Sequence, residues 1–305
     1  MPNSHPIEAS RRPAVTGSVL VALAAFGFSA KAILVKLAYL HSVDAVTLLA
    51  LRMAFALPFF LLMGIWGKPS AIQGKLGLAD GAAVVGLGLL GYYLASFLDF
   101  WGLEYISAGL ERLILFLYPT LVVTFSFLFL GRPIRFKEMA ALILSYAGIG
   151  LVFYRQVSVG QPGMMLGAGL VFGSTVAYAA YLMGSHRIIQ KLGARRFTAY
   201  AMTVACMACL AQFALTHPLS ALKVPTPVYA LTLGMAVFST VLPSLLLSMG
   251  IQRIGASRAA LIGSIGPVAT IALAYAVLGE VMGRDQWLGS LLVLAGVLVV
   301  SLGKR

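Results

Sequence analysis

Charged side chains interrupt the long apolar stretches of this 305-residue sequence, and they are the residues best suited to do chemistry. An ionised group in hydrocarbon is costly and is tolerated where it faces a partner or a water-filled cavity. Four cations and four carboxylates lie in or beside apolar runs of the first half: Lys31, Lys36, Arg52, Arg112, Asp44, Asp99, Glu104 and Glu111. Equal numbers at similar depth indicate salt bridges that fix helix packing, or groups that bind and gate a permeating molecule.

Position along the chain favours one interpretation for some of these residues and leaves both open for the others. Lys36, Asp44 and Glu104 lie near the ends of expected helices, where side chains reach the interface, so structural pairing is favoured for these three. The deeper charges are equally compatible with a gate or substrate site: Lys31, Arg52, Asp99, Glu111 and Arg112.

Polar residues three, four or seven positions apart share one face of a helix. Three such stripes occur in the sequence: Tyr92, Ser96 and Asp99; Glu111 and Tyr118; and Tyr178, Tyr181 and Ser185. A tyrosine lines an apolar pocket while offering one hydroxyl, which suits a compact zwitterion or an aromatic metabolite. The alternative for each tyrosine is an interfacial belt or a helix contact.

Two prolines recur at equivalent positions inside apolar runs, Pro119 and Pro267. A proline within a helix removes a backbone hydrogen bond, so both predict a kink that serves either a rocking motion or a static bend. Gly263 and Gly266 flank Ser264, and these small residues predict a close helix contact or a polar notch. Ser264 is therefore a candidate for substrate contact.

Composition predicts the elements that position these residues. Sixty per cent of the residues are hydrophobic, only 10% are charged and the mean hydropathy is +0.96, which is typical of an integral membrane protein. The formal net charge is +13, and the basic residues that cause it lie between apolar runs. They therefore indicate a lipid surface rather than nucleic acid as the partner. Ten runs are long enough for transmembrane helices: 15–38, 45–66, 79–102, 107–130, 136–154, 163–186, 197–216, 227–250, 257–279 and 285–302.

The chain contains an inverted duplication. Residues 102–152 align without gaps on 250–300, and the charges flanking the shared apolar pattern change sign, as at Arg132 and Glu280. With a cytoplasmic amino terminus, 15 of the 22 basic residues fall inside and 3 outside, which predicts cytoplasmic termini. We expect a disordered tail over 1–14, a five-helix repeat over 15–154, a linker over 155–162 and a second five-helix repeat over 163–302.

Two short motifs do not predict cofactor or metal chemistry. The GxGxxG pattern at 86–91 lies within an apolar span and without a βαβ context, so it indicates helix packing. Cys206 and Cys209 form CxxC, but they are the only cysteines and both lie in an apolar helix. No cofactor and no catalytic residue are expected.

The second repeat resembles a known family. Pro267, Leu278-Gly279-Glu280, Gln286, Gly289 and Gly296 are similar to the EamA-type branch of the drug/metabolite transporter superfamily, and the resemblance covers about residues 15–302. It implies a ten-helix carrier for small metabolites, often an exporter of amino acids or their relatives. The first repeat departs from this pattern at Gly131-Arg132-Pro133, so a role for the glutamate transfers only to Glu280.

These observations predict an all-α secondary transporter with two inverted five-helix repeats, which works by alternating access in a bacterial inner membrane. Export of amino acids or related compounds is the first hypothesis. Uptake, or efflux of lipophilic cations or drugs, is the alternative within the class, and a membrane-embedded enzyme or a non-transporting scaffold is the alternative outside it. The expected partners are a small metabolite and the lipid bilayer; protons or a counter-substrate and the oligomeric state are left open.

Overall fold

The computed structural model describes residues 7–66, 77–131, 133–134, 136–158, 162–254, 262–263, 265–280 and 283–302. The first half contains α1 (Ile7–Tyr39), α2 (Ala45–Trp66), α3 (Leu78–Gly88), the π-helix η1 (Leu89–Leu94), α4 (Ala95–Leu103), α5 (Ala108–Leu115), α6 (Tyr118–Leu130) and α7 (Phe136–Ser158). The second contains α8 (Met164–Leu192), α9 (Ala194–Thr216), the 3-10 helix η2 (Leu219–Leu222), α10 (Thr226–Ala236), the π-helix η3 (Val237–Val241), α11 (Leu242–Ile254), α13 (Gly266–Leu278) and α14 (Arg284–Leu302).

The described residues confirm the all-α membrane fold with ten segments. Seven helical stretches are long and apolar enough to cross a membrane: Val15–Tyr39, Ala45–Ile65, Leu78–Leu103, Ala108–Phe129, Met164–Ser185, Arg195–Thr216 and Thr226–Leu247. Three shorter apolar helices supply the remaining segments: Met139–Leu151, Gly266–Leu278 and Trp287–Gly296. Several boundaries differ from expectation: α1 already begins at Ile7, α7 continues to Ser158 and α8 continues to Leu192. Each extension adds backbone hydrogen bonds to an existing helix.

Glycines create two equivalent crossings between the repeats. A Cβ on Gly102 of α4 would lie 2.5 Å from Val171 Cγ2 and 2.8 Å from the Gly167 carbonyl oxygen, both on α8. A Cβ on Gly250 of α11 would lie 2.4 Å from Val21 Cγ2 on α1, next to the Gly17 carbonyl oxygen. Gly102 aligns with Gly250, so each repeat packs its third segment against the first helix of the other.

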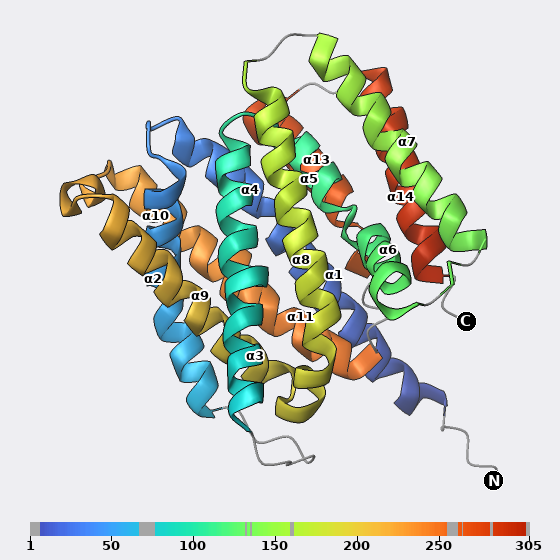
Figure 1. The fold of residues 1–305 in the computed structure, drawn as a ribbon, viewed down its shortest axis with the longest axis horizontal. Helices are drawn as coiled ribbons and strands as arrows, with labels where there is room; N and C mark the ends of the chain where they lie inside the picture. The colour runs from blue at the N-terminus through green and yellow to red at the C-terminus, as the bar shows by residue number, and fades with distance from the viewer. Residues whose placement is uncertain are drawn as a thin grey trace.

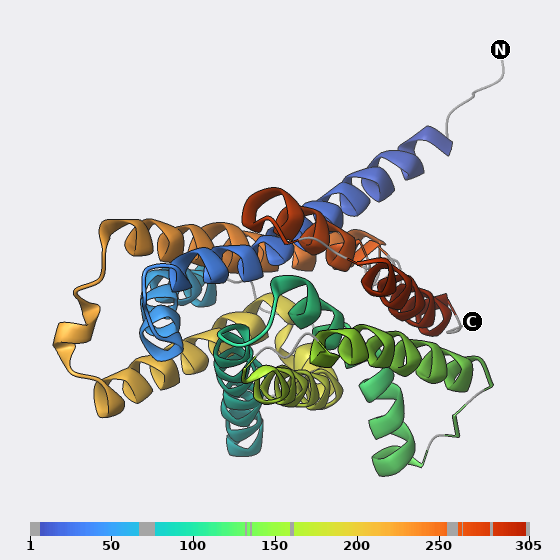
Figure 2. The same ribbon diagram turned by 90° about the horizontal axis from the view of Figure 1, so that it is seen from above.

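The last helices of the two repeats, α7 and α14, run side by side at one edge of the bundle (Figures 1 and 2). A Cβ on Gly148 would lie 2.5 Å from the Gly289 carbonyl oxygen, and one on Gly296 would lie 2.7 Å from the Ala141 carbonyl oxygen. Gly148 and Gly296 are themselves equivalent in the alignment. This small-residue contact is therefore also shared by the two repeats.

The third segment of each repeat contains a π-helix at the same place. Extending the ungapped alignment places Leu89, where η1 begins, opposite Val237, where η3 begins. A π-helix inserts an extra residue into a helical turn and is frequently found at functional sites. The duplication thus preserved an irregular turn midway along both helices.

The fourth segment of the first repeat is broken midway between α5 and α6, and in the second repeat α13 begins at the equivalent position. The sequence predicts a kink at Pro119 and Pro267, but the structure places each proline in the first turn of a new helix, α6 or α13. Proline lacks an N–H and fits this position, where no intrahelical donor is needed. Both helices end at equivalent glycines in the left-handed conformation, Gly131 with φ of 62° and Gly279 with φ of 66°.

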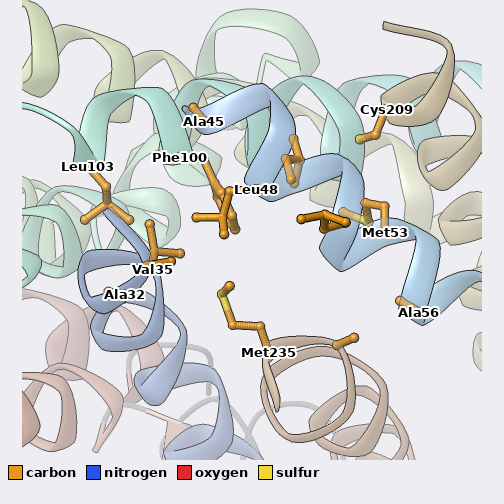
Figure 3. Packing of buried hydrophobic residues seen from close by; sticks show 14 of the residues in the cluster. Ala32, Val35, Ala45, Leu48, Met53, Ala56, Phe100, Leu103, Cys209 and Met235 are labelled. Atoms are coloured by element: carbon orange, nitrogen blue, oxygen red, sulfur yellow. The ribbon is translucent and has the colours of Figure 1, made fainter. Parts of the chain in front are cut away.

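A dense apolar cluster holds the cavity-facing charges in place (Figure 3). It packs α1, α2, α4 and α10 together through Ala32, Val35, Leu48, Met53, Phe100, Leu103 and Met235. Ala32, Met53 and Phe100 are at most 2% exposed, and each directly follows a charged residue: Lys31, Arg52 or Asp99. Well-packed neighbours leave these charged side chains little freedom to move away.

Polar contacts at one end of the bundle join segments expected to end on the outer side. The Asp44 carboxylate lies 3.4 Å from His217 Nε2, and Glu104 Oε1 accepts a hydrogen bond of 3.0 Å from the first amide of α2, at Ala45. Burial raises the pKa of Glu104, and Asp44 raises it further. Asp44 and Glu104 therefore join segments through a histidine and a backbone amide, and not through the lysine and arginine partners that the sequence offered.

Two further contacts each join helix ends that are expected on the same side of the membrane. Asp80 at the start of α3 forms an ion pair of 2.9 Å with Lys191 at the end of α8, which are both expected on the inner side. On the outer side, Glu280 accepts hydrogen bonds of 3.1 and 3.3 Å from the amides of Ala108 and Gly109, the first residues of α5. The glutamate singled out by the family resemblance therefore caps a helix of the other repeat.

The Gly102 crossing gives a test of this packing. We expect Gly102→Ala to lower stability by about 1–3 kcal/mol, because the added methyl group overpacks the contact with α8. Gly169→Ala is the matched control, since nothing lies within 4 Å of a Cβ at this position on α8. Thermal unfolding of the detergent-purified variants measures both effects, and equal midpoints for the two would contradict the crossing.

Candidate functional site

A cavity of about 430 Å³ lies between the two repeats. The first repeat lines it with Val21, Ala25, Phe28, Lys31, Arg52, Gly91, Tyr92, Ala95, Ser96, Asp99, Arg112, Leu115, Phe116 and Tyr118. The second contributes Ser174, Tyr178, Thr198, Met202, Ser239, Thr240, Ser244, Leu247 and Gly263. Both π-helices, the start of α6 and Gly263 shortly before α13 thus meet at this cavity, which has the size of a small-molecule site.

An ion cluster forms part of the cavity wall. The Lys31 ammonium contacts Asp99 Oδ2 and lies 3.1 Å from Glu111 Oε1. Asp99 and Glu111 are at most 2% exposed, and Lys31 reaches the cavity above them. Glu111 itself does not line the cavity but supports the lysine from behind. One ammonium therefore compensates two buried carboxylates. Removing it would leave both carboxylates buried without a counter-charge, which is strongly destabilising.

Arg52 lies on the cavity wall without a carboxylate partner among the described residues. Its Nε and Nη2 donate hydrogen bonds of 3.0 and 2.9 Å to Thr240 Oγ1, across the boundary between the repeats. The guanidinium also lies over the Phe100 ring, 5.1 Å from its centroid, which is a cation–π contact. Its Nη1 atom is buried and has no hydrogen-bond partner.

Arg112 projects from α5 toward the start of α13. A Cβ on Gly266 would lie 2.6 Å from Arg112 Nη2, so the absence of a side chain there makes room for the guanidinium. The Nε atom of Arg112 is buried and, like Nη1 of Arg52, has no hydrogen-bond partner. The two arginines are therefore the cavity cations whose hydrogen-bonding capacity is incompletely used.

Four tyrosines form an aromatic cluster on one side of the cavity. The Tyr118 and Tyr178 rings meet edge to face with centroids 5.5 Å apart, and Tyr178 stacks on Tyr181 at 5.7 Å. The Tyr92 hydroxyl hydrogen-bonds the Tyr181 hydroxyl at 2.8 Å. Tyr181 lies behind the wall and is only 4% exposed, whereas the other three line the cavity.

The structure breaks one of the sequence-derived stripes and keeps another. Glu111 and Tyr118 do not share one helix face, because the chain turns at Phe116 and Leu117 and places them on α5 and α6. Tyr92, Ser96 and Asp99 all reach the cavity from η1 and α4. Ser264, expected near Pro267, lies outside the residues that the structure describes.

The hydroxyl residues of the second repeat were missed by sequence reasoning. The extended alignment pairs Tyr92 with Thr240 and Ser96 with Ser244, and Thr240 and Ser244 also line the cavity. Serine and threonine in an apolar helix give little signal alone. Projecting the first-repeat stripe through the duplication would have identified both.

Two glycines of the GxGxxG pattern, Gly88 and Gly91, serve helix packing, as the sequence indicates, whereas nothing lies within 4 Å of a Cβ at Gly86. A Cβ on Gly88 would lie 2.6 Å from the Ala201 carbonyl oxygen on α9, and one on Gly91 would lie 2.2 Å from the Tyr181 ring. Cys206 and Cys209 are free and buried in α9, where Cys206 contacts Met53. Neither motif takes part in the cavity chemistry beyond the wall position of Gly91.

Comparison with known proteins identifies the family. The EamA-like transporter family matches residues 15–154 and 165–302, which correspond to the two repeats. The chain belongs to the EamA-like transporter family. This membership confirms the expected drug/metabolite transporter relationship and indicates a membrane transporter rather than an enzyme.

Relatives of this EamA-like protein are also named as transporters. The uncharacterized transporter YcbK of Bacillus subtilis is 31% identical over 290 residues, which cover 91% of this chain and 90% of that protein. The uncharacterized transporter YyaM of the same organism is 28% identical over 218 residues, covering 70% and 71% of the two chains. A solved crystal structure shares the fold with a TM-score of 0.66 at 16% identity, covering 95% of this chain and 98% of that one.

Removing the shared cation tests the ion cluster. We expect Lys31→Gln to destabilise the protein by about 3–5 kcal/mol, because Asp99 and Glu111 stay buried without their counter-charge. Adding Asp99→Asn and Glu111→Gln to this variant should restore part of the loss. Lys191→Gln is the control, because its ion pair with Asp80 is partly exposed and should contribute little. Thermal unfolding is the measurement, and an unchanged midpoint for Lys31→Gln would contradict the assignment.

Proposed function

We propose that this EamA-like protein is a secondary transporter that exports amino acids or related small metabolites across a bacterial inner membrane by alternating access. The observation that carries this proposal is a cavity with charged and hydroxyl groups in a largely apolar wall, lined by both members of an inverted repeat. In carriers built this way, substrate binds near the midplane and the two repeats rock around it.

The packing around the cavity fits one state of such a cycle. On the outer side of Asp99, the link between the third and fourth segments is tightly packed. Its residues Leu103, Ile106 and Ala108 are at most 1% exposed. At the other end, the cavity wall includes Thr198, close to the start of α9. With cytoplasmic termini, the cavity approaches the cytoplasm, and the link on the outer side of Asp99 is tightly packed, which supports loading of an export substrate from inside.

The irregular helices supply a physical basis for motion. Matched π-helices and matched helix breaks interrupt the hydrogen-bond ladder of the third and fourth segments in both repeats. Such interruptions at membrane depth are tolerated where the backbone is buried in protein or lines a cavity. The interrupted segments are therefore the elements that we propose to bend between states.

The charges offer a route for coupling. Asp99 and Glu111 share the single Lys31 ammonium, so a proton taken up by one carboxylate would balance the cluster. Protons or a counter-substrate would then drive the cycle. Efflux of lipophilic cations is the less favoured alternative, because Lys31, Arg52 and Arg112 already place three cations on the wall.

A cavity-filling substitution tests the carrier proposal. We expect Ser96→Phe to reduce metabolite counterflow in proteoliposomes at least about tenfold, because the ring would occupy substrate volume. Ala54→Phe is the matched control: Ala54 is exposed on the lipid side of α2 and does not line the cavity. Radiolabelled amino acids and related metabolites are the probes. Absence of flux for the native protein across the whole panel would contradict the proposal.

A further inference from the structure

We propose that the cavity selects small organic monoanions, with Arg52 and Arg112 as the groups that receive a carboxylate. This inference rests on the proposed transport function and narrows its substrate from amino acids and related compounds to members with a net negative charge. It is carried by the charge balance, by unused donors on both arginines and by the orientation of two broken helices.

The charge balance of the cavity is positive. Among the described residues, its wall and immediate support hold three cations, Lys31, Arg52 and Arg112, and two carboxylates, Asp99 and Glu111. Lys31 contacts both carboxylates, and neither arginine lies within ion-pair distance of a described carboxylate. Asp99 attracts Arg52 only from a greater distance. One positive charge in this low-dielectric site is left to be balanced.

Arg52 is built to hold an anion. It is 6% exposed, and two of its nitrogens share one neutral oxygen, Thr240 Oγ1, which leaves the guanidinium charge uncompensated. Its third nitrogen, Nη1, is buried without a partner. A buried charge and an unused donor are both costly unless something completes the site. Phe100 fixes the plane of the guanidinium from one side.

Arg112 supplies a second guanidinium on the same wall that has no carboxylate partner among the described residues. Its Nε atom is buried without a partner, and its side chain lines the cavity beside Gly263 and the first turn of α13. Guanidinium groups bind carboxylates through paired, charge-assisted hydrogen bonds, which are stronger than neutral ones. A carboxylate in the cavity would lie beside both guanidinium groups and balance the charge that the described residues leave uncompensated.

The two broken helices add to the same electrostatic preference. Both α6 and α13 begin midway through their segments, and neither has a side-chain cap at its first turn. Tyr118, the first residue of α6, and Gly263, shortly before α13, both line the cavity. The amino-terminal ends of helices carry partial positive charge and favour anions. The helix starts act together with the buried arginines rather than alone.

The remaining wall defines the body of the substrate. Tyr92, Tyr118, Tyr178, Phe28 and Phe116 surround the polar groups with aromatic surface in a cavity of about 430 Å³. A single carboxylate on an apolar or aromatic body matches both this surface and the surplus of one positive charge. The ammonium of a zwitterion would add a further cation to a wall that already holds Lys31, Arg52 and Arg112.

Matched ligands of different charge test the inference on the purified full-length protein. The probes are phenylacetate, indole-3-acetate and isovalerate, each with its amide and its amine, together with phenylalanine and phenyl phosphate. We expect only the carboxylates to raise the thermal unfolding midpoint, since a ligand that binds the folded state stabilises it by mass action. Arg52→Gln and Arg112→Gln should each require at least about tenfold more carboxylate for the same shift.

Arg195→Gln is the matched control, because Arg195 is exposed on α9 and does not line the cavity. Arg112→Gln keeps the test decisive if the more deeply buried Arg52 variant fails to fold. Stabilisation by amides, amines, zwitterions or phenyl phosphate equal to that by the carboxylates would overturn the inference, as would no carboxylate shift at all. Flux assays separate the two proposals: transport of amines or neutral compounds would refute the anion site alone, whereas carboxylate binding without any flux would refute the carrier alone.

Discussion

Burial of charge inside a membrane is the constraint on which the rest of this structure depends. Asp99 and Glu111 are almost fully buried, and the Lys31 ammonium between them is what makes their burial tolerable. An apolar cluster on α1, α2, α4 and α10 then fixes the backbone beside these groups (Figure 3). The cavity lies where this arrangement meets the second repeat, so the same charges that hold the first repeat together also define the chemistry of its inner wall.

The scaffold is symmetric, but its chemistry is not. The π-helices, the helix breaks, the glycine crossings and the α7–α14 contact all recur in both repeats. Aligned wall positions differ, however: Asp99 corresponds to Leu247, Arg112 to Ala260 and Tyr92 to Thr240. The first repeat therefore carries the charges, and the second contributes hydroxyl groups, such as the Thr240 oxygen that orients Arg52. Duplication supplied a symmetric framework, and divergence concentrated the charged groups of the cavity on one side.

Much of this fold follows from the sequence because the bilayer leaves few alternatives. Long apolar runs must become helices, and the charge reversal between Arg132 and Glu280 already implied an inverted duplication. The helix breaks before Pro119 and Pro267 were expected only as kinks, since a proline pattern does not distinguish a bend from a new first turn. Pairing partners such as Lys31 with Glu111 depend on how helices rotate against each other, which no periodicity within a single helix reveals.

The most direct test is whether equivalent positions of the two repeats face one aqueous cavity. Single cysteines at Ser96→Cys and Ser244→Cys, in a background where Cys206 and Cys209 are replaced by alanine, are reacted in intact membranes with a membrane-impermeant thiol reagent applied to each side. The account predicts that both cysteines are labelled and that Ala54→Cys, on the lipid side at similar depth, is not. A cavity cysteine that reacts from neither side of the membrane would contradict a shared passage between the repeats. Labelling of Ala54→Cys equal to that of the cavity cysteines would contradict it as well.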